Sequence, residues 1–202
     1  MLHIDLVVFD LGGVLVQIVR SWAEAHERAG LSFPPPSASE FEARRAALPR
    51  HDNGIDDQGV YTAEDVRRMS DAWLIKEYPG ISRVFDALKA ACVDTAVLSN
   101  TNDAHWVRLY VQPQDEPEFP TLARAKHRFA SHVLGVEKPD ARAYRHVERV
   151  TGHSADRIMF FDDLLENIEG ARAVGWTAEL IDHTGDTASQ MLASLRRRGI
   201  VD

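Results

Sequence analysis

The chain has 202 residues and a formal net charge of −8, and 45% of its residues are hydrophobic, which suits one domain with an insertion. The absence of a long basic run excludes a protein that binds the nucleic-acid backbone, because such binding needs clustered Lys and Arg. The sequence has neither a signal peptide nor the roughly 18 consecutive apolar residues of a membrane span, so we expect a cytoplasmic protein without a membrane partner. Cys92 is the only cysteine and is expected to be a packed thiol.

The first predicted strand, residues 4–9, is a continuous apolar run of the kind that parallel sheets bury on both faces. Asp10 follows at its carboxyl end, which is where open α/β sheets bind ligands. Gly12 and Gly13 then permit a sharp turn and a close approach of the backbone to a ligand. Taken alone, this stretch is equally well explained as a strand that runs into an ordinary turn.

An inserted segment, residues 17–79, follows this strand and contains no convincing strand of its own. We expect a helix over 21–29 that stops at Gly30, a second over 37–48 that begins at a capping box, and a third over 62–76. Residues 52–57 are predicted to be a polar loop because they lack the glycine and the glutamate of a calcium-binding loop. The inserted segment is therefore predicted to be helical.

From residue 80 onward, strands and helices alternate. The pattern predicts strands over 95–98, 129–133, 158–161 and 177–181. It predicts helices over 81–92, 140–152 and 187–198, and a further helix that follows Asp163 and runs through residue 173. Such alternation implies a parallel sheet with right-handed crossovers. The predicted fold is α/β: a Rossmann-like core of residues 1–16 and 80–202 that carries the inserted segment.

Polar residues follow four of the predicted strands or loops: Asp10, Ser99, Lys138 and the pair Asp162–Asp163. Because strand ends share one edge of a parallel sheet, these side chains can converge. Together they suit phosphoryl transfer through a covalent aspartyl-phosphate, with a divalent cation offsetting the repulsion between carboxylate and phosphate. Singly, Ser99 is as well explained by a helix cap and Lys138 by a surface position, whereas adjacent carboxylates after an apolar strand favour a cation.

The chain resembles the haloacid dehalogenase (HAD) superfamily over nearly its whole length. Four motifs occur in the family's order: Asp10 after an apolar strand, Ser99 ending a strand, Lys138 before a proline, and the Asp162–Asp163 pair with Asn167 on the next helix. The inserted segment falls where subfamily I carries its helical cap. The stretches around Asp10, Ser99 and Asp162 are most similar to bacterial sugar-phosphate phosphatases, such as α-D-glucose-1-phosphate phosphatase.

This resemblance implies a Mg²⁺-dependent hydrolase that acts on a small phosphomonoester. Asp10 would be the nucleophile, and Lys138 and Ser99 would assist it. Ser99, Asn100, Lys138 and Gly13 would bind the substrate, and the metal would be held by Asp10, the Gly12 carbonyl, Asp163 and Asp162.

The sequence departs from the family pattern at Gly12, where most family phosphatases carry a second Asp that acts as general acid and base. Such catalysis is worth typically about 10²–10⁴-fold, so slow turnover is expected. Two alternatives stay open. A metal-independent 2-haloacid dehalogenase also lacks the second Asp, although its fourth motif is not an acidic pair. A phosphate-binding relic of the fold would be weakly active or inactive, because Gly12 replaces the usual acid and base.

Overall fold

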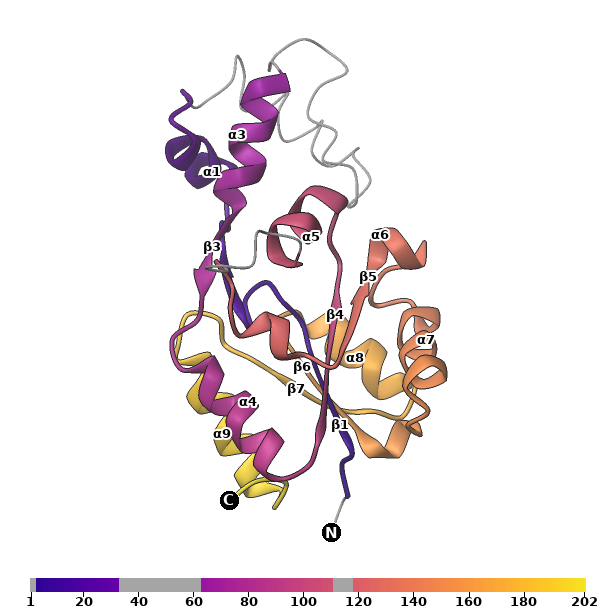
Figure 1. Ribbon diagram of the computed structural model, residues 1–202. Coiled ribbons are helices and arrows are strands. Elements are labelled where there is room, and N and C mark those ends of the chain that lie inside the picture. The colour runs from indigo at the N-terminus through magenta and orange to yellow at the C-terminus, as the bar shows by residue number, and fades with distance from the viewer. Residues whose placement is uncertain (1–2, 33–62, 111–117) are drawn as a thin grey trace.

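The computed structural model describes residues 3–32, 63–110 and 118–202, and a parallel five-stranded sheet forms the core of this part of the chain (Figure 1). The strands are β1 (Leu6–Phe9), β4 (Asp94–Ser99), β5 (His127–Ala130), β6 (Ile158–Asp162) and β7 (Thr177–Leu180), in the order β5-β4-β1-β6-β7. In the central strand, Phe9 lies opposite Val97 of β4 and Phe161 of β6. The carboxyl ends of these three strands therefore meet, and the predicted α/β parallel fold is confirmed.

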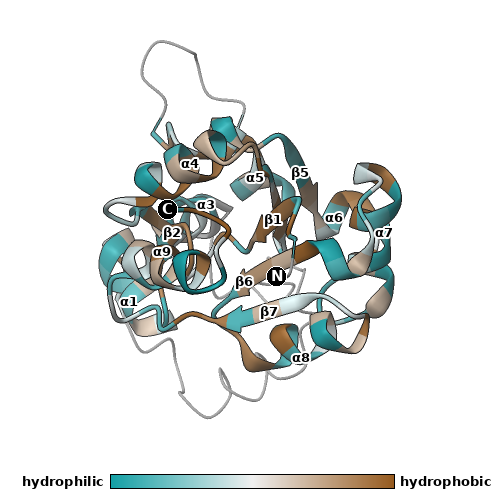
Figure 2. Cartoon of the chain, turned by 90° about the horizontal axis from the view of Figure 1, so that it is seen from below, coloured by the Kyte–Doolittle hydropathy of each residue, from teal (hydrophilic) through white to brown (hydrophobic). Residues whose placement is uncertain are grey.

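Helices cover both faces of the sheet. Helices α4 (Ile81–Ala90) and α9 (Thr187–Arg197) pack side by side on one face, and α7 (Ala141–Thr151) and α8 (Leu165–Ala173) pack on the other (Figure 1). The sheet separates two buried apolar clusters, to which alternate residues of β1 contribute. Figure 2 shows strands β1 and β6 as hydrophobic between the helices that cover them. None of the helices in the described ranges is long and apolar enough to cross a membrane.

The described parts of the inserted segment contain two helices and two strands. Helix α1 (Trp22–Ala29) begins at the N-cap Ser21 and ends at Gly30, as predicted, and helix α3 (Ala63–Trp73) packs against it. The prediction that this segment lacks strands is wrong, because β2 (Val16–Ile18) and β3 (Leu74–Glu77) pair antiparallel. The predicted helix over 37–48 and the predicted polar loop over 52–57 lie outside the described residues.

Two further elements differ from the sequence prediction. Helix α5 (Asp103–Tyr110) lies between two predicted strands, in a stretch for which no helix was predicted from the sequence. The side chain of Asn102 caps this helix by accepting a 2.9 Å hydrogen bond from the backbone N–H of His105. The strand predicted over 129–133 is shifted toward the N-terminus, and helix α6 (Ser131–Leu134) begins immediately after it. Short 3₁₀ turns over Leu122–Arg124 and Ala155–Arg157 precede β5 and β6.

Cys92 is exposed, so the prediction of a packed thiol is wrong. It lies in the turn that follows α4, where its φ of 57° belongs to the left-handed region. The chain reverses direction at this point to enter β4, and the side chain consequently faces solvent rather than the core.

Candidate active site

The predicted site residues follow the three central strands of the sheet. Asp10 comes directly after β1, Ser99 is the last residue of β4, and Asp162 is the last residue of β6. Lys138 reaches the same edge from the loop between α6 and α7. The ends of β1, β4 and β6 thus bring together residues from four separate stretches of sequence.

Lys138 is the buried centre of this cluster. Its ammonium group donates 2.7 Å hydrogen bonds to Asp10 Oδ1 and to Asp162 Oδ2. The side chain of Lys138 is 1% exposed, that of Asp162 is 0% exposed and that of Asp10 is 13% exposed. A lysine is rarely buried to this extent unless it is paired, so the two carboxylates account for its position. Of these three side chains, only that of Asp10 is partly accessible to solvent.

The backbone of Lys138 is fixed by the amide side chain of Asn100. The Nδ2 atom of Asn100 donates to the Lys138 carbonyl at 2.8 Å, and the Lys138 N–H donates to Asn100 Oδ1 at 2.9 Å. Nearby, Ser131 Oγ accepts from the Thr101 N–H at 3.0 Å and donates to the Thr101 carbonyl at 3.1 Å. These bonds tie the loop after β4 to the loops that follow β5, and they place the Lys138 ammonium group beside Asp10.

Burial and charge oppose each other in this cluster. Burial raises the pKa of Asp10 to about 7, and the neighbouring charges of Asp162 and Asp163 act in the same direction, whereas Lys138 opposes the rise. Burial alone would lower the pKa of Lys138, but the carboxylates of Asp10 and Asp162 raise it, so the ammonium group stays charged. The carboxylates are therefore only partly compensated, and a further cation would favour their ionised forms.

Asp162 and Asp163 have different surroundings although they are adjacent in sequence. Asp162 Oδ1 accepts from the Leu164 N–H at 2.8 Å, and Asn167 Nδ2 donates to both oxygens of Asp162 at 3.1 and 3.0 Å. With the bond from Lys138, both oxygens of Asp162 are thus engaged within the protein. Asp162 holds Lys138 and the start of α8 in place, whereas Asp163 faces the inserted segment.

The neighbours of Asp163 are residues that the sequence analysis did not identify. Arg20 Nη1 lies 2.8 Å from Asp163 Oδ2, and His183 Nδ1 lies 3.7 Å from the same atom. Burial raises the pKa of Asp163, and the guanidinium of Arg20 opposes that rise. Arg20 comes from the inserted segment and His183 from the loop between β7 and α9, and no local pattern marks either residue.

Gly13 allows Asp163 and Arg20 to come so close to the first strand. A Cβ atom at Gly13 would lie 2.2 Å from both Asp163 Oδ2 and Arg20 Nη2, and the φ of Gly13 is +82°. At Gly12 a Cβ atom would meet only the flexible end of Ile18, at 2.8 Å from Cδ1. Position 13 therefore requires glycine, whereas position 12 can accept a side chain if Ile18 shifts.

The carboxylates form a group that suits a hard cation. Oxygen atoms of Asp10, Asp162 and Asp163 all lie within 4.8 Å of one another. Mg²⁺ prefers carboxylate oxygens of this kind. The donor chemistry and the incompletely compensated charge of this group both fit a divalent metal. Within the group, Asp10 is the carboxylate most exposed to solvent, and Asp163 is the one that contacts Arg20 of the inserted segment.

The structure is thus a Rossmann-like parallel α/β core with a lysine buried between two aspartates at the carboxyl ends of its central strands. A family model for haloacid dehalogenase-like hydrolases matches residues 4–175, and the chain is a member of that family. The resemblance to this family that the four sequence motifs indicated is thereby confirmed.

Known proteins resemble this chain in sequence and in fold. The chain is 36% identical to a phosphatase of Mycobacterium tuberculosis over 72 residues, which are 36% of this chain and 33% of that protein. The match thus spans only about a third of that curated relative. A HAD family enzyme of Bacteroides thetaiotaomicron, solved with magnesium and inorganic phosphate, superposes with a TM-score of 0.70 at 18% identity, over 93% of this chain and 98% of that one.

The L-2-haloacid dehalogenase of Xanthobacter autotrophicus has the same fold, with a TM-score of 0.62 and 21% identity over 95% of this chain and 83% of that one. At such identities, likeness to a phosphate-bound enzyme and to a dehalogenase establishes the fold only. The choice between the two chemistries rests on the residues of the site.

Proposed function

We propose that the protein is a Mg²⁺-dependent phosphatase that hydrolyses a small phosphomonoester through an aspartyl-phosphate on Asp10. The observation that carries this proposal is the bond from the buried ammonium group of Lys138 to Asp10 Oδ1 at 2.7 Å, beside two further carboxylates. This arrangement holds one carboxylate oriented and partly accessible while its charge is shared with a fixed cation. Such a carboxylate is a suitable nucleophile for phosphorus.

In the proposed reaction, a carboxylate oxygen of Asp10 attacks phosphorus as the bond from phosphorus to the leaving-group oxygen breaks. Water then hydrolyses the acyl phosphate, which releases inorganic phosphate and regenerates Asp10. Lys138 stabilises negative charge on the transferring group. Ser99, at the end of β4, binds a phosphate oxygen, and Asn100 acts through Lys138 by fixing its backbone. Gly13 was predicted to bind the substrate as well, but its N–H donates to the Val16 carbonyl at 2.9 Å, so we do not assign it that role.

Asp10, Asp163 and the Gly12 carbonyl are the ligands that we propose for Mg²⁺. The metal would supply positive charge that offsets the repulsion between the Asp10 carboxylate and the substrate phosphate. Asp162 was predicted to be a ligand as well, but we now propose that it positions Lys138, because both its oxygens already accept hydrogen bonds within the protein.

The substrate class also belongs to this proposal. The similarity of the motifs to bacterial sugar-phosphate phosphatases favours a sugar phosphate, and α-D-glucose 1-phosphate is the first compound to test. We further propose that the inserted segment, residues 17–79, is a cap that covers the leaving group, and that residues 1–16 and 80–202 form the core domain. Cytoplasmic localisation stays a prediction from the sequence.

Removal of the metal provides the primary test of the function. With p-nitrophenyl phosphate and α-D-glucose 1-phosphate as substrates, we expect phosphate release that requires added Mg²⁺ and stops when EDTA is in excess. Readdition of Mg²⁺ should restore the rate. Full activity in EDTA, or no phosphate release from a broad panel of phosphorylated sugars and nucleotides, contradicts the proposal.

Introducing the missing acid and base should accelerate the enzyme. Gly12→Asp places a carboxyl group beside Asp10, and the only close contact, with the end of Ile18, can relax. Because general acid–base catalysis contributes about 10²–10⁴-fold, we expect kcat to rise by at least about tenfold. Gly12→Asn is the matched control, since its amide has the same shape and cannot transfer the proton. An equal response of kcat to both variants would refute this role for position 12.

A 2-haloacid dehalogenase is the second candidate, and the specific observation in its favour is Gly12. Such enzymes need no second aspartate to act as an acid, because the halide that they displace leaves without a proton. Asp163 argues against this candidate, since its buried carboxylate has a natural role at a metal site and none in metal-free halide displacement. Release of chloride from 2-chloropropionate in EDTA, without phosphate release from any phosphomonoester, would favour the dehalogenase.

A further inference from the structure

Arg20 brings a positive charge from the inserted segment to the carboxylate group of the core. Its Nη1 atom lies 2.8 Å from Asp163 Oδ2, and the Asp163 side chain is only 3% exposed. The second cation of the cluster, Lys138, is bonded to Asp10 and Asp162. Among the described residues, Arg20 is therefore the closest cationic partner of Asp163, ahead of His183 at 3.7 Å.

This ion pair engages a carboxylate that a divalent metal would need. Arg20 Nη1 lies 2.8 Å from Asp163 Oδ2, and Asp163 belongs with Asp10 to a group of carboxylates whose oxygens lie within 4.8 Å of one another. Two cations of like charge repel strongly at such separations in a partly buried site. Arg20 and a metal bound beside Asp163 would therefore compete for the negative charge of this carboxylate.

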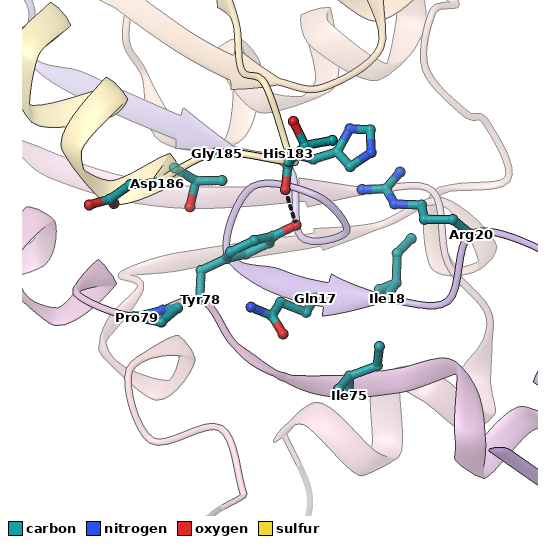
Figure 3. A pocket seen from close by; sticks show the side chains of 11 residues that line it. Gln17, Ile18, Arg20, Ile75, Tyr78, Pro79, His183, Gly185 and Asp186 are labelled. Atoms are coloured by element: carbon teal, nitrogen blue, oxygen red, sulfur yellow. Dashed lines mark hydrogen bonds between the residues drawn. The ribbon is translucent and has the colours of Figure 1, made fainter. Parts of the chain in front are cut away.

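Arg20 has room to move away from Asp163. A cavity of about 470 Å³ adjoins it, lined on one side by Gln17 and Ile18 of β2 and on the other by Tyr78 and the loop that begins at His183. Figure 3 shows Arg20 and His183 at one end of this cavity, with the Tyr78 hydroxyl donating to the His183 carbonyl at 2.9 Å. The Arg20 side chain is 35% exposed, so a displaced guanidinium can remain solvated.

Arg20 is also joined directly to the start of helix α1. Its backbone N–H donates to Glu24 Oε2 at 3.0 Å, and the next residue, Ser21, caps the helix by accepting from the Glu24 N–H at 3.1 Å. The contact of the Arg20 guanidinium with Asp163 therefore links the residue that precedes the N-cap of α1 to the core.

We infer that Arg20 is a built-in counter-cation that competes with Mg²⁺ for Asp163, so that metal binding releases the Arg20–Asp163 contact between the inserted segment and the core. This inference rests on the proposed metal site. In the metal-free protein, Arg20 neutralises Asp163 and holds the start of α1 against the core. In the metal-bound protein, the guanidinium turns into the adjoining cavity and the start of α1 loses this attachment.

Calorimetric titration of the full chain with Mg²⁺ alone, without substrate, tests the competition. We expect Arg20→Gln to bind Mg²⁺ at least about tenfold more tightly than the wild type, because a competing charge is removed. Arg20→Lys, which keeps the charge, should bind nearly as the wild type does. Arg67→Gln is the matched control, since Arg67 also pairs with carboxylates in the inserted segment but lies on the exposed face of α3.

The hydrogen-exchange rates of the α1 backbone amides provide a second test, because they would not respond to Mg²⁺ if Arg20 had only a structural role. Saturating Mg²⁺ should increase exchange in the first turn of α1 in the wild type, and have no such effect in Arg20→Gln. Equal or weaker Mg²⁺ affinity of Arg20→Gln would overturn the inference while leaving the phosphatase proposal intact. Absence of Mg²⁺ binding in every variant would overturn both the inference and the metal assignment.

Discussion

Asp10→Asn should reduce phosphate release by about 10⁴-fold or more, because a carboxamide cannot form the acyl phosphate and loss of a nucleophile removes the whole covalent route. The substitution is nearly isosteric, and the amide oxygen can still accept the hydrogen bond that Lys138 now donates to Asp10 Oδ1. We therefore expect a folded, inactive protein. Steady-state assays with p-nitrophenyl phosphate and Mg²⁺ measure the loss, and circular dichroism checks the fold.

Asp156→Asn is a suitable control for this experiment. Asp156 is exposed in the 3₁₀ turn before β6, at the end of the sheet opposite to Asp10, where it accepts a hydrogen bond from Ser154. The Asp156→Asn substitution should leave the rate of phosphate release within about twofold of the wild-type rate, because substitutions at exposed positions usually have small effects. Retention of more than a few per cent of the activity by Asp10→Asn would rule out Asp10 as the nucleophile.

Lys138→Met should destabilise the fold and abolish activity together. Methionine retains the bulk of the lysine side chain but leaves the buried carboxylates of Asp10 and Asp162 without their shared cation. Removal of one partner from a buried ion pair typically costs about 3–5 kcal/mol of unfolding free energy. Denaturant unfolding at pH 8 measures this cost.

The cost should depend on pH in a definite direction. Without Lys138, burial and the neighbouring carboxylate charges raise the pKa of Asp10 further above its value in the unfolded chain, so the folded state retains a proton that the unfolded state loses. Stability of the variant then falls as pH rises above the unfolded carboxylate pKa, and the difference from the wild type is larger at pH 8 than at pH 5. Lys126→Met breaks a half-exposed pair with Asp94 and should cost at most about 1 kcal/mol at either pH.

The core sheet and the residues at its strand ends were predictable because both depend on local signals. The apolar runs before Asp10 and Asp162 mark buried strands, and a parallel sheet brings such ends to one edge by its topology. The N-cap residue Asp140 and the C-cap residue Gly152 likewise mark the two ends of helix α7, and each acts on the adjacent turn of the helix. In these stretches, local propensity and tertiary packing favour the same structure.

The errors lie where a distant partner decides the structure. Leu74–Glu77 has good helix-forming residues, so it reads as a continuation of α3, yet pairing with β2 across the inserted segment makes it a strand. Arg20 and His183 could not be found for a related reason, because each contacts Asp163 through tertiary structure alone. The difference between Asp162 and Asp163 was also invisible, since it depends on which of the two receives the bonds from Lys138 and Asn167.

Direct detection of the covalent intermediate on Asp10 tests the central claim most sharply. The enzyme would be mixed rapidly with p-nitrophenyl phosphate and Mg²⁺, quenched in acid and reduced with borohydride, which converts an aspartyl phosphate to homoserine. Because Gly12 supplies no base to activate water, we expect the phosphoenzyme to accumulate, with a burst of p-nitrophenol and homoserine at position 10 in the mass spectrum. Phosphate release without a burst and without modification of Asp10, even at the shortest mixing times, would contradict the account.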